Sequence, residues 1–233
     1  MIASKRLIDL SQEIYDGMPV YAGHLETKIW QHHTHAETAP KFDSDFSFQS
    51  LGISFCDHGP THVDAFSHLD PNPDAPTIDK MPLDLFWGEA TCLDVSDVLA
   101  PDYIDSDRLD RALVDSPVDL KPGDILLLYT GSAERYGGTA EYTITYPGLD
   151  QSGADWLRDR RVKAFGVDTP SPDNPIDRIY PAHIFSRDQG VTHYENLANL
   201  AEVAGRRFTF LGFPLRIRAG HGSPVRAMAL LDD

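Results

Sequence analysis

The sequence of 233 residues contains few cysteines and no long apolar run. Cys56 and Cys92 are its only cysteines and do not form a Cys-x-x-Cys pair, so we expect two reduced thiols rather than a disulfide framework. No uninterrupted apolar stretch approaches the roughly 20 residues of a membrane-spanning helix, which argues against a membrane protein. The N-terminal residues lack an apolar signal core, which predicts a cytoplasmic protein.

Basic side chains are also scarce. The chain has 20 Lys and Arg residues against 36 Asp and Glu residues, which gives a net charge of -16. Such a charge repels phosphate backbones and anionic lipid heads, so neither a nucleic acid nor a membrane surface is an expected partner. The hydrophobic content of 41% is sufficient for a sizeable core, and no linker-like segment divides the chain. We therefore expect a single domain over residues 1–233.

Hydrophobic patterning predicts a mixed α/β fold. The apolar run Ile125–Tyr129 is typical of a central strand covered on both faces. Alternating residues in 46–56 predict a half-buried strand that leads directly to His58. Ser106 or Asp107 is the expected N-cap of a helix over 105–114. The other expected strands are 6–10, 28–32, 91–95, 163–167, 208–213 and 225–231, and the other expected helices are 152–162 and 181–188.

Three histidines and a carboxylate lie within eleven positions, from His58 to His68. His58, His62 and Asp64 offer two imidazoles and an oxygen ligand, a combination that zinc, manganese and iron(II) accept in catalytic sites. Gly59 and Pro60 disfavour a helix here, so the ligands are expected on a loop after a strand. His68 is either a further ligand or a proton-transfer group beside the metal, and we favour the second role.

Other interpretations of this cluster are open from the residues alone. The two histidines could simply donate hydrogen bonds to carbonyls while Asp64 caps a helix. Two histidines and one carboxylate also match the facial triad of iron(II) oxygenases. A second group, His32, His33 and His35, is expected at the surface, because adjacent strand residues point to opposite faces and cannot all converge on one ion.

The segment 58–68 resembles the signature His-x-Gly-Thr-His-x-Asp-x-Pro-x-His of a cyclase family that includes bacterial kynurenine formamidases and isatin hydrolases. His58, Thr61, His62, Asp64 and His68 match it at the same spacing. Further similarity extends from about residue 7 to 231. It includes Gly17-Met-Pro19, Gly166-Val-Asp168-Thr-Pro-Ser171, Glu195-Asn-Leu-Ala-Asn-Leu200, Pro214-Leu-Arg-Ile and Gly222-Ser-Pro-Val-Arg226.

The resemblance implies a site for one or two divalent ions, manganese or zinc. His58, His62 and Asp64 would hold the first ion, and Asp64 would bridge to a second ion held by His183 and Glu195. His68 would be the catalytic acid and base. A bound divalent ion lowers the pKa of water from 15.7 toward about 7, which makes hydroxide available near neutral pH.

The resemblance also implies a fold, an activity and an assembly. The fold would be a mixed β-sheet curled toward a barrel with flanking helices, of a swivelling β/β/α-like type. The activity would be hydrolysis of a C–N bond in a small amide, formamide, lactam or imide, as in an arylformamidase or an isatin hydrolase. The assembly would be a homodimer or homotetramer. A metal-dependent cyclase or dehydratase and a non-catalytic metal-binding protein are the alternatives.

Two positions depart from the family signature. Pro60 occupies the glycine position and Phe66 the proline position, and both changes preserve the spacing of the metal ligands. Phe66 and Tyr21 are candidates for an aromatic wall around a planar substrate. Trp30 and Trp87 are also candidates, but for each tryptophan we favour packing in the core.

Three further polar residues are not expected to bind the metal directly. His193 and His221 are expected beyond the ligand shell or at the surface. Asp168 follows a predicted strand, where it could either orient a ligand histidine or cap a loop.

Overall fold

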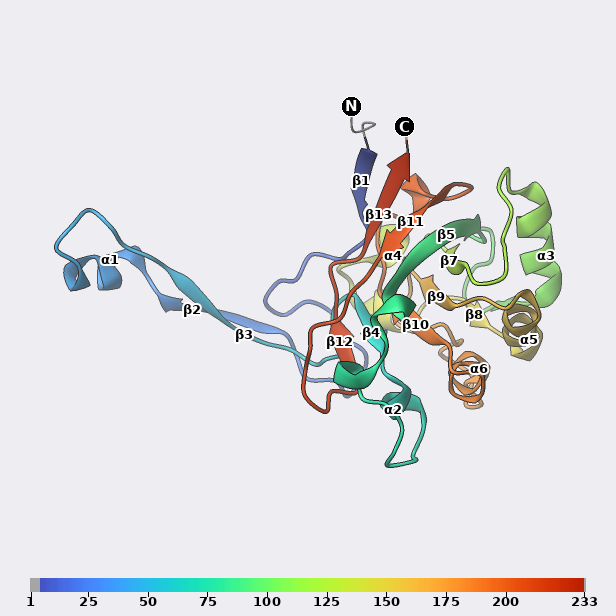
Figure 1. The fold of residues 1–233 in the computed structure, drawn as a ribbon, viewed down its shortest axis with the longest axis horizontal. Coiled ribbons are helices and arrows are strands. Elements are labelled where there is room, and N and C mark those ends of the chain that lie inside the picture. Colours follow the sequence, from blue (N-terminus) through green and yellow to red (C-terminus); the bar gives the residue numbers. More distant parts are fainter. Residues whose placement is uncertain (1–4, 233) are drawn as a thin grey trace.

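A nine-stranded mixed sheet organises the computed structural model, which describes residues 5–232 (Figure 1). Its strand order is β1-β13-β11-β5-β7-β9-β10-β4-β12. The sheet curls into a half-barrel, which confirms the predicted mixed α/β class. In chain order its strands are β1 (Lys5–Asp9), β4 (His62–Asp64), β5 (Trp87–Asp94), β7 (Ile125–Tyr129), β9 (Ala164–Val167), β10 (Thr192–Glu195), β11 (Arg207–Leu211), β12 (Gly222–Pro224) and β13 (Met228–Asp232).

Strand β7 is central, as its apolar run predicted. It pairs in parallel with β5 and β9 and is almost completely buried. Because successive side chains point to opposite faces, Ile125 and Leu127 enter one hydrophobic core while Leu126 and Leu128 enter another. The two cores lie on opposite faces of the sheet and fix its central strands.

Three longer helices cover one face of the sheet (Figure 1). They are α3 (Ser106–Asp115), α5 (Gln151–Arg160) and α6 (Pro181–Gln189). The N-cap of α3 is Asp105, whose side chain accepts a hydrogen bond from the backbone of Arg108, so neither Ser106 nor Asp107 caps this helix. The short helices are α1 (His35–Thr38), α2 (Phe66–Leu69) and α4 (Ser132–Tyr136), and β6 (Tyr103–Ile104) pairs with β8 (Gly148–Leu149) in a small separate sheet.

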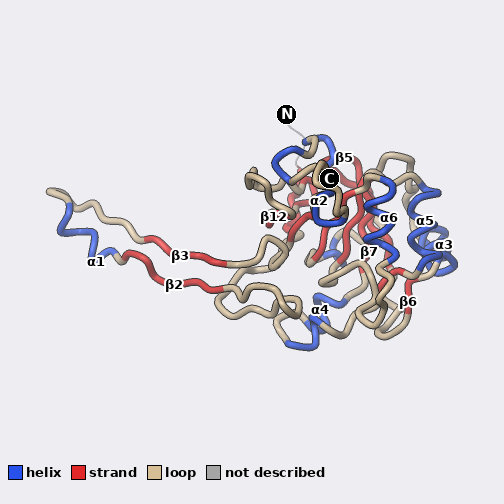
Figure 2. The backbone as a smooth tube through the Cα atoms, turned by 90° about the horizontal axis from the view of Figure 1, so that it is seen from below, coloured by secondary structure: helices blue, strands red, loops and turns tan. Residues whose placement is uncertain are grey.

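A two-stranded ribbon projects from the body of the molecule (Figures 1 and 2). It consists of β2 (Lys28–His33) and β3 (Ser50–Ser54), which pair antiparallel. The strand predicted within residues 46–56 is present as Ser50–Ser54, but the expected burial of its apolar face is wrong, since Leu51 and Ile53 are each 55% exposed. Alternation reports that a strand has two different faces, but it does not report whether anything covers the apolar one.

The strands β10, β4 and β12 form one end of the main sheet. In this region Glu195 lies opposite His62, and Gly222 lies opposite Asp64. Residues predicted as ligands from distant parts of the chain are thus neighbours on paired strands. Across the described residues, no helix is long and apolar enough to cross a membrane, and the cytoplasmic location stays a prediction.

Candidate metal centre

Two adjacent strands supply the centre with four side chains. His62 and Asp64 are two residues apart on β4, and His193 and Glu195 are two residues apart on β10. Residues at this spacing in a strand point to the same face. Since His62 lies directly opposite Glu195, all four side chains meet on one face of the strand pair.

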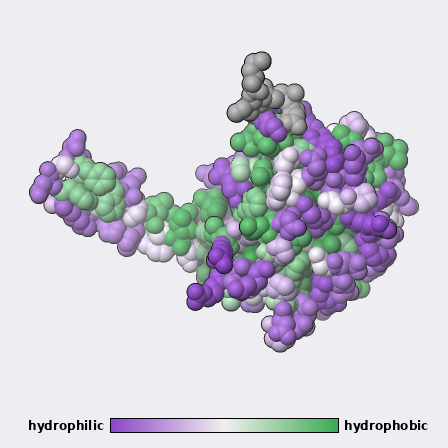
Figure 3. Space-filling view, in the orientation of Figure 1, coloured by the Kyte–Doolittle hydropathy of each residue, from purple (hydrophilic) through white to green (hydrophobic). Residues whose placement is uncertain are grey.

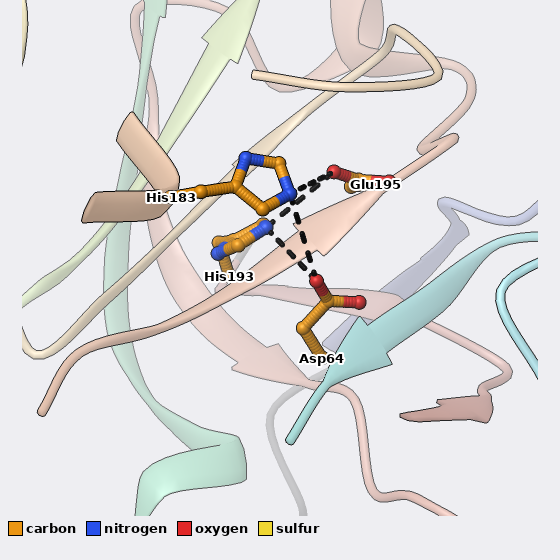
Figure 4. Close-up of side chains that lie close together, drawn as sticks. All are labelled: Asp64, His183, His193 and Glu195. Atoms are coloured by element: carbon orange, nitrogen blue, oxygen red, sulfur yellow. Dashed lines mark ion pairs between the residues drawn. The ribbon is translucent and has the colours of Figure 1, made fainter. Parts of the chain in front are cut away.

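Three more histidines join from outside the sheet. His58 lies in the loop before β4, His68 lies on α2, and His183 lies on α6. Figure 4 shows His183 and His193 pointing from different elements toward the carboxylates of Asp64 and Glu195. The structure therefore brings together all six residues of the predicted ligand and acid–base set.

Ligand atoms in the centre lie at separations that suit coordination of an ion. On one side of Asp64, its Oδ1 is 3.2 Å from His58 Nε2 and 3.3 Å from His62 Nε2. On the other side, Asp64 Oδ2 is 3.3 Å from His193 Nε2 and 3.9 Å from His183 Nε2. Donor atoms around one tetrahedral ion with bonds of about 2.1 Å lie about 3.4 Å apart. Asp64 is thus placed between two groups of imidazoles.

Glu195, like Asp64, lies between the two groups of imidazoles. Its Oε2 is 3.3 Å from His62 Nε2, and its Oε1 is 3.4 Å from His193 Nε2 and 3.7 Å from His183 Nε2. Each carboxylate therefore offers one oxygen to each side. Asp64 and Glu195 would therefore both be available to hold one or two ions together with these imidazoles.

The outer nitrogen of each ligand histidine is held by a fixed partner. His62 Nδ1 lies 2.8 Å from the carbonyl oxygen of Pro60, and His58 Nδ1 lies 3.0 Å from the carboxylate of Asp57. Both partners are acceptors, so Nδ1 carries the proton and donates it. In the neutral ring the Nε2 lone pair then points into the centre, as in metal-ligating histidines with outer-shell acceptors.

The same arrangement recurs on the other side. His183 Nδ1 donates to Asp173 Oδ2 at 2.5 Å, and the other oxygen of Asp173 accepts from the backbone of Ala182 at 2.7 Å. His193 Nδ1 lies 3.0 Å from the hydroxyl of Ser186. All four imidazoles thus present Nε2 to the two carboxylates.

Unpaired buried atoms show that the centre fits a cation. Among the described residues, eight buried side-chain nitrogen and oxygen atoms have no hydrogen-bond partner, and six of them belong to this centre. A buried polar atom without a partner is costly, so a cluster of six requires another partner. Mixed imidazole and carboxylate donors suit zinc or manganese. The six atoms are His58 Nε2, His62 Nε2, both oxygens of Asp64, His193 Nε2 and Glu195 Oε1.

Without an ion, protons balance the charges in the centre. Burial disfavours the imidazolium form, yet Asp64 and Glu195 outweigh it and raise the pKa of His62 to about 10. The same balance raises the pKa of His193 to about 9. Burial disfavours the carboxylate form of Glu195, but His193 and His62 lower its pKa to about 2. The two carboxylates therefore remain charged and attract cations, either protons on histidine or metal ions.

A pocket of about 390 Å³ opens onto the centre beside His68. His68 Nε2 is 3.7 Å from Asp64 Oδ2, and the centroid of the His68 ring lies 4.1 Å from that of His58. Burial lowers the pKa of His68, as do His58 and His183, so the ring is neutral near pH 7 and can accept a proton. The pocket is lined by Tyr21, His24, His58, His68, Leu69, Pro170, Ser171, Tyr180, His183, Ile184, Arg187 and Glu195.

Several positions differ from the sequence-based expectations. His193 is neither beyond the ligand shell nor at the surface, because it is fully buried with its Nε2 in the centre. Its place two residues before Glu195 in a strand was the available signal. Phe66 packs against the hydrophobic core and is not among the pocket-lining residues, whereas Tyr21 lines the pocket. His221 is exposed.

The aspartate that orients a ligand histidine is Asp173, and Asp168 instead caps a loop. Asp168 accepts hydrogen bonds from the backbone of Thr130 and Gly131, each at 2.8 Å. His24 is a pocket residue that the sequence did not indicate. Its ring lies 6.1 Å from that of His58, and its buried Nδ1 has no hydrogen-bond partner within residues 5–232.

The fold and the centre together define an α/β protein in which a His/Asp/Glu cluster able to bind a metal lies beside a pocket. A family model described as "Putative cyclase" matches residues 8–174, and the chain belongs to this family. The resemblance noted in the sequence is thereby confirmed.

Known relatives and solved structures resemble the whole chain. A protein named kynurenine formamidase from Salinibacter ruber is 28% identical over 230 residues, which cover 95% of this chain and 96% of the relative. Another of the same name from Geobacillus thermodenitrificans is 29% identical over 220 residues, covering 94% of this chain and 95% of the relative. Isatin hydrolase A from Labrenzia aggregata shares the fold with a TM-score of 0.84 at 21% identity, covering 98% of this chain and 94% of that one.

Proposed function

We propose that this protein hydrolyses the C–N bond of a small planar amide, formamide or lactam, with His68 as the proton-transfer group. As predicted, the chain is a hydrolase acting on C–N bonds other than peptide bonds. The observation that carries the proposal is the placement of His68 beside four imidazoles that converge on Asp64 and Glu195. The four imidazoles and two carboxylates also argue against an iron(II) oxygenase, because its facial triad uses only three protein ligands.

The residues of the centre have separable tasks. His58, His62, His183 and His193 would hold one or two zinc or manganese ions together with Asp64 and Glu195. Such an ion, when bound, polarises a carbonyl and makes water a better nucleophile near neutral pH. His68 Nε2 faces the same space, so it can take the proton from attacking water and return it to the leaving nitrogen.

The pocket walls favour a flat, partly apolar substrate. Leu69, Pro170 and Ile184 line the pocket with apolar side chains. Tyr21 and Tyr180 also line it, and their hydroxyls lie 3.3 Å apart. Aromatic side chains offer flat faces for stacking together with a polar end. Kynurenine formamidase and isatin hydrolase are names of relatives, so N-formylkynurenine and isatin are the first substrates to examine.

The test is a substrate panel with defined metal loading. Purified protein loaded with zinc or manganese is assayed with N-formylkynurenine, isatin and a cyclic imide. We expect hydrolysis of at least one amide that stops after chelation, and loss of this activity in His68→Gln with its metal content retained. Hydrolysis that persists in fully chelated protein would contradict the proposal.

A further inference from the structure

The chain segment that leads into the projecting ribbon also forms part of the pocket wall. Figure 3 shows hydrophobic side chains along this ribbon, whose strand β2 begins at Lys28. Shortly before it, Tyr21 and His24 line the pocket beside the metal centre. They are the first and last residues of a tight turn, because the backbone N–H of His24 donates to the carbonyl oxygen of Tyr21 at 3.0 Å. The turn thus brings two ring side chains to the pocket.

Gly23 sets the shape of this turn. Its φ of +94° lies in the left-handed region, which glycine adopts without steric cost and which a type II turn requires at its third residue. The rings of Tyr21 and His24 lie 5.4 Å apart. The hydroxyl of Tyr21 lies 3.3 Å from that of Tyr180, which precedes α6, so the turn is tied to the α6 side of the pocket. The backbone bond and this contact together hold His24 at the pocket.

The His24 ring has no hydrogen-bond partner in the protein. Its Nδ1 is one of only two buried unpaired side-chain atoms outside the metal centre among residues 5–232. Its Nε2 likewise has no protein partner, but it is not among the buried atoms. Since the ring lines the pocket, Nε2 is the nitrogen that a molecule in the pocket can reach.

The burial of Nδ1 indicates which nitrogen of His24 carries the proton. A neutral imidazole is a donor at one nitrogen and an acceptor at the other. A proton on Nδ1 would create a buried N–H without an acceptor, and such N–H groups are rarer in native structures than unpaired acceptors. A proton on Nε2 instead points to the pocket, where a bound molecule can accept it. His24 therefore offers the pocket a hydrogen-bond donor.

The neighbouring ring of His58 has the opposite arrangement. His58 Nδ1 donates to Asp57, which leaves its Nε2 lone pair for the metal centre. The centroid of the His24 ring lies 6.1 Å from that of His58, and the centroid of the His68 ring lies 4.1 Å from it. A molecule that reaches the centre beside His68 can thus meet the His24 donor about one ring away.

We propose that His24 selects substrates that carry a second carbonyl oxygen beside the scissile amide. This inference rests on the proposed function, in which the scissile carbonyl lies at the metal centre. On a planar ring, an acyl group next to the amide extends past it, so its oxygen can accept from His24 Nε2 while the amide stays beside His68. A site that hydrogen-bonds a substrate group discriminates against the analogue that lacks this group. His24 would thereby determine specificity without binding the metal.

Two formamides that differ in this carbonyl test the selection. Zinc-loaded protein is assayed with ortho-formamidoacetophenone, which has the second carbonyl, and with formanilide, which lacks it. The ratio of their kcat/KM values is expected to fall about tenfold in His24→Phe, which keeps a ring and removes the donor. His24→Gln, which places an amide N–H near the position of Nε2, should keep most of the ratio.

The matched control is His32→Phe, the same replacement at an exposed histidine on β2, and it should keep the wild-type ratio. All variants are compared at equal zinc content, so that a loss of metal is not mistaken for a loss of selection. An unchanged ratio in His24→Phe, or an equal fall in the control, would overturn the role of His24.

NMR of zinc-loaded protein with nitrogen-labelled histidine tests the same donor without turnover. The His24 signals are assigned by their loss in His24→Phe, and we expect them to show the proton on Nε2. The product ortho-aminoacetophenone should shift the Nε2 signal, whereas aniline, which lacks the carbonyl, should not. A proton on Nδ1, or equal shifts with both compounds, would overturn the inference.

The two readouts separate this inference from the proposed function. If the wild type hydrolyses neither formamide while His24 Nε2 responds only to the compound with the carbonyl, the proposed function fails and the donor role of His24 is supported. If both formamides are hydrolysed and His24 Nε2 responds to neither product, the hydrolase proposal stands and the role of His24 is refuted.

Discussion

Asp173 Oδ2 accepts a hydrogen bond from His183 Nδ1 at 2.5 Å and thereby turns His183 Nε2 toward Asp64 and Glu195. Asp173 is itself held by backbone donors at the start of α6. A carboxylate behind a ligand histidine fixes the ring and increases its basicity. Asp173 should therefore control metal affinity without touching the ion.

Replacing this carboxylate should weaken metal binding. Asp173→Asn is expected to reduce the affinity for zinc or manganese about 10- to 100-fold, because the His183 ring loses its charged acceptor. Isothermal titration of chelator-treated protein measures the effect. Asp159→Asn, on the exposed face of α5, is the matched control and should bind as the wild type does. Equal affinity in both variants would refute this role of Asp173.

Replacing His193 and replacing His68 should have different effects, the first on metal content and the second on kcat. His193→Ala removes a buried donor from the centre and should lower metal content in purified protein. His68→Gln should keep the metal and lose about 10²- to 10⁴-fold in kcat, because it removes only the proton-transfer group. Metal analysis and steady-state kinetics on both variants check this division. A His68→Gln protein that loses its metal would make His68 a ligand instead.

Gly222 should be intolerant of any side chain. A Cβ at this position would lie 2.7 Å from the ring of His58, which Asp57 holds from its other side. Gly222→Ala should therefore displace His58 Nε2 from Asp64 and weaken one metal site roughly tenfold or more. The number of ions bound per chain should fall while the thermal stability of the chelated protein changes little. Unchanged stoichiometry and affinity would show that His58 does not need its present position.

Metal removal should make stability depend on pH. In protein from which a chelator has removed the metal, the raised pKa values of His62 and His193 stabilise the folded state. This stabilisation is complete below pH 6.5 and disappears as pH rises through about 9 to 10. The lowered pKa of Glu195 gives a stabilisation present above 4.5 that is lost as pH falls through about 2. Chelated protein should thus be most stable between these ranges.

A bound metal ion would take over the role that the protons on His62 and His193 have in the metal-free protein, and these protons are lost at alkaline pH. The difference in Tm between metal-loaded and chelated protein should therefore be larger near pH ~9 than near pH ~6. Thermal denaturation at both values measures it, with His62→Ala as a variant in which the difference should shrink. A difference that is equal at both pH values would contradict this balance of charges.

The sequence predicted local features better than distant relationships. Residues His58, His62 and Asp64 lie close together along the chain, so their spacing alone indicated a ligand cluster. His193 was missed because its role depends on β10 pairing with β4, although its spacing from Glu195 already placed both on one face. Asp173 was missed because only the fold places it beside His183.

Strand β7 of the central sheet and strand β3 of the projecting ribbon show the same limit of prediction from sequence, which is that a local pattern does not report what covers a strand. A continuous apolar run identifies β7 as buried, because no other environment suits five such residues in a strand. Alternation in β3 is equally regular, yet its apolar face is exposed. Local pattern specifies a strand, whereas tertiary or quaternary contacts decide what covers it.

The central claim is that four imidazoles and two carboxylates form one metal centre. Anomalous diffraction from crystals soaked with zinc or manganese measures this most directly. We predict one or two anomalous peaks within bonding distance of Asp64 and Glu195, contacting His62 Nε2 or His193 Nε2. Crystals with no peak there at saturating metal, or with a peak coordinated by other residues, would contradict the claim.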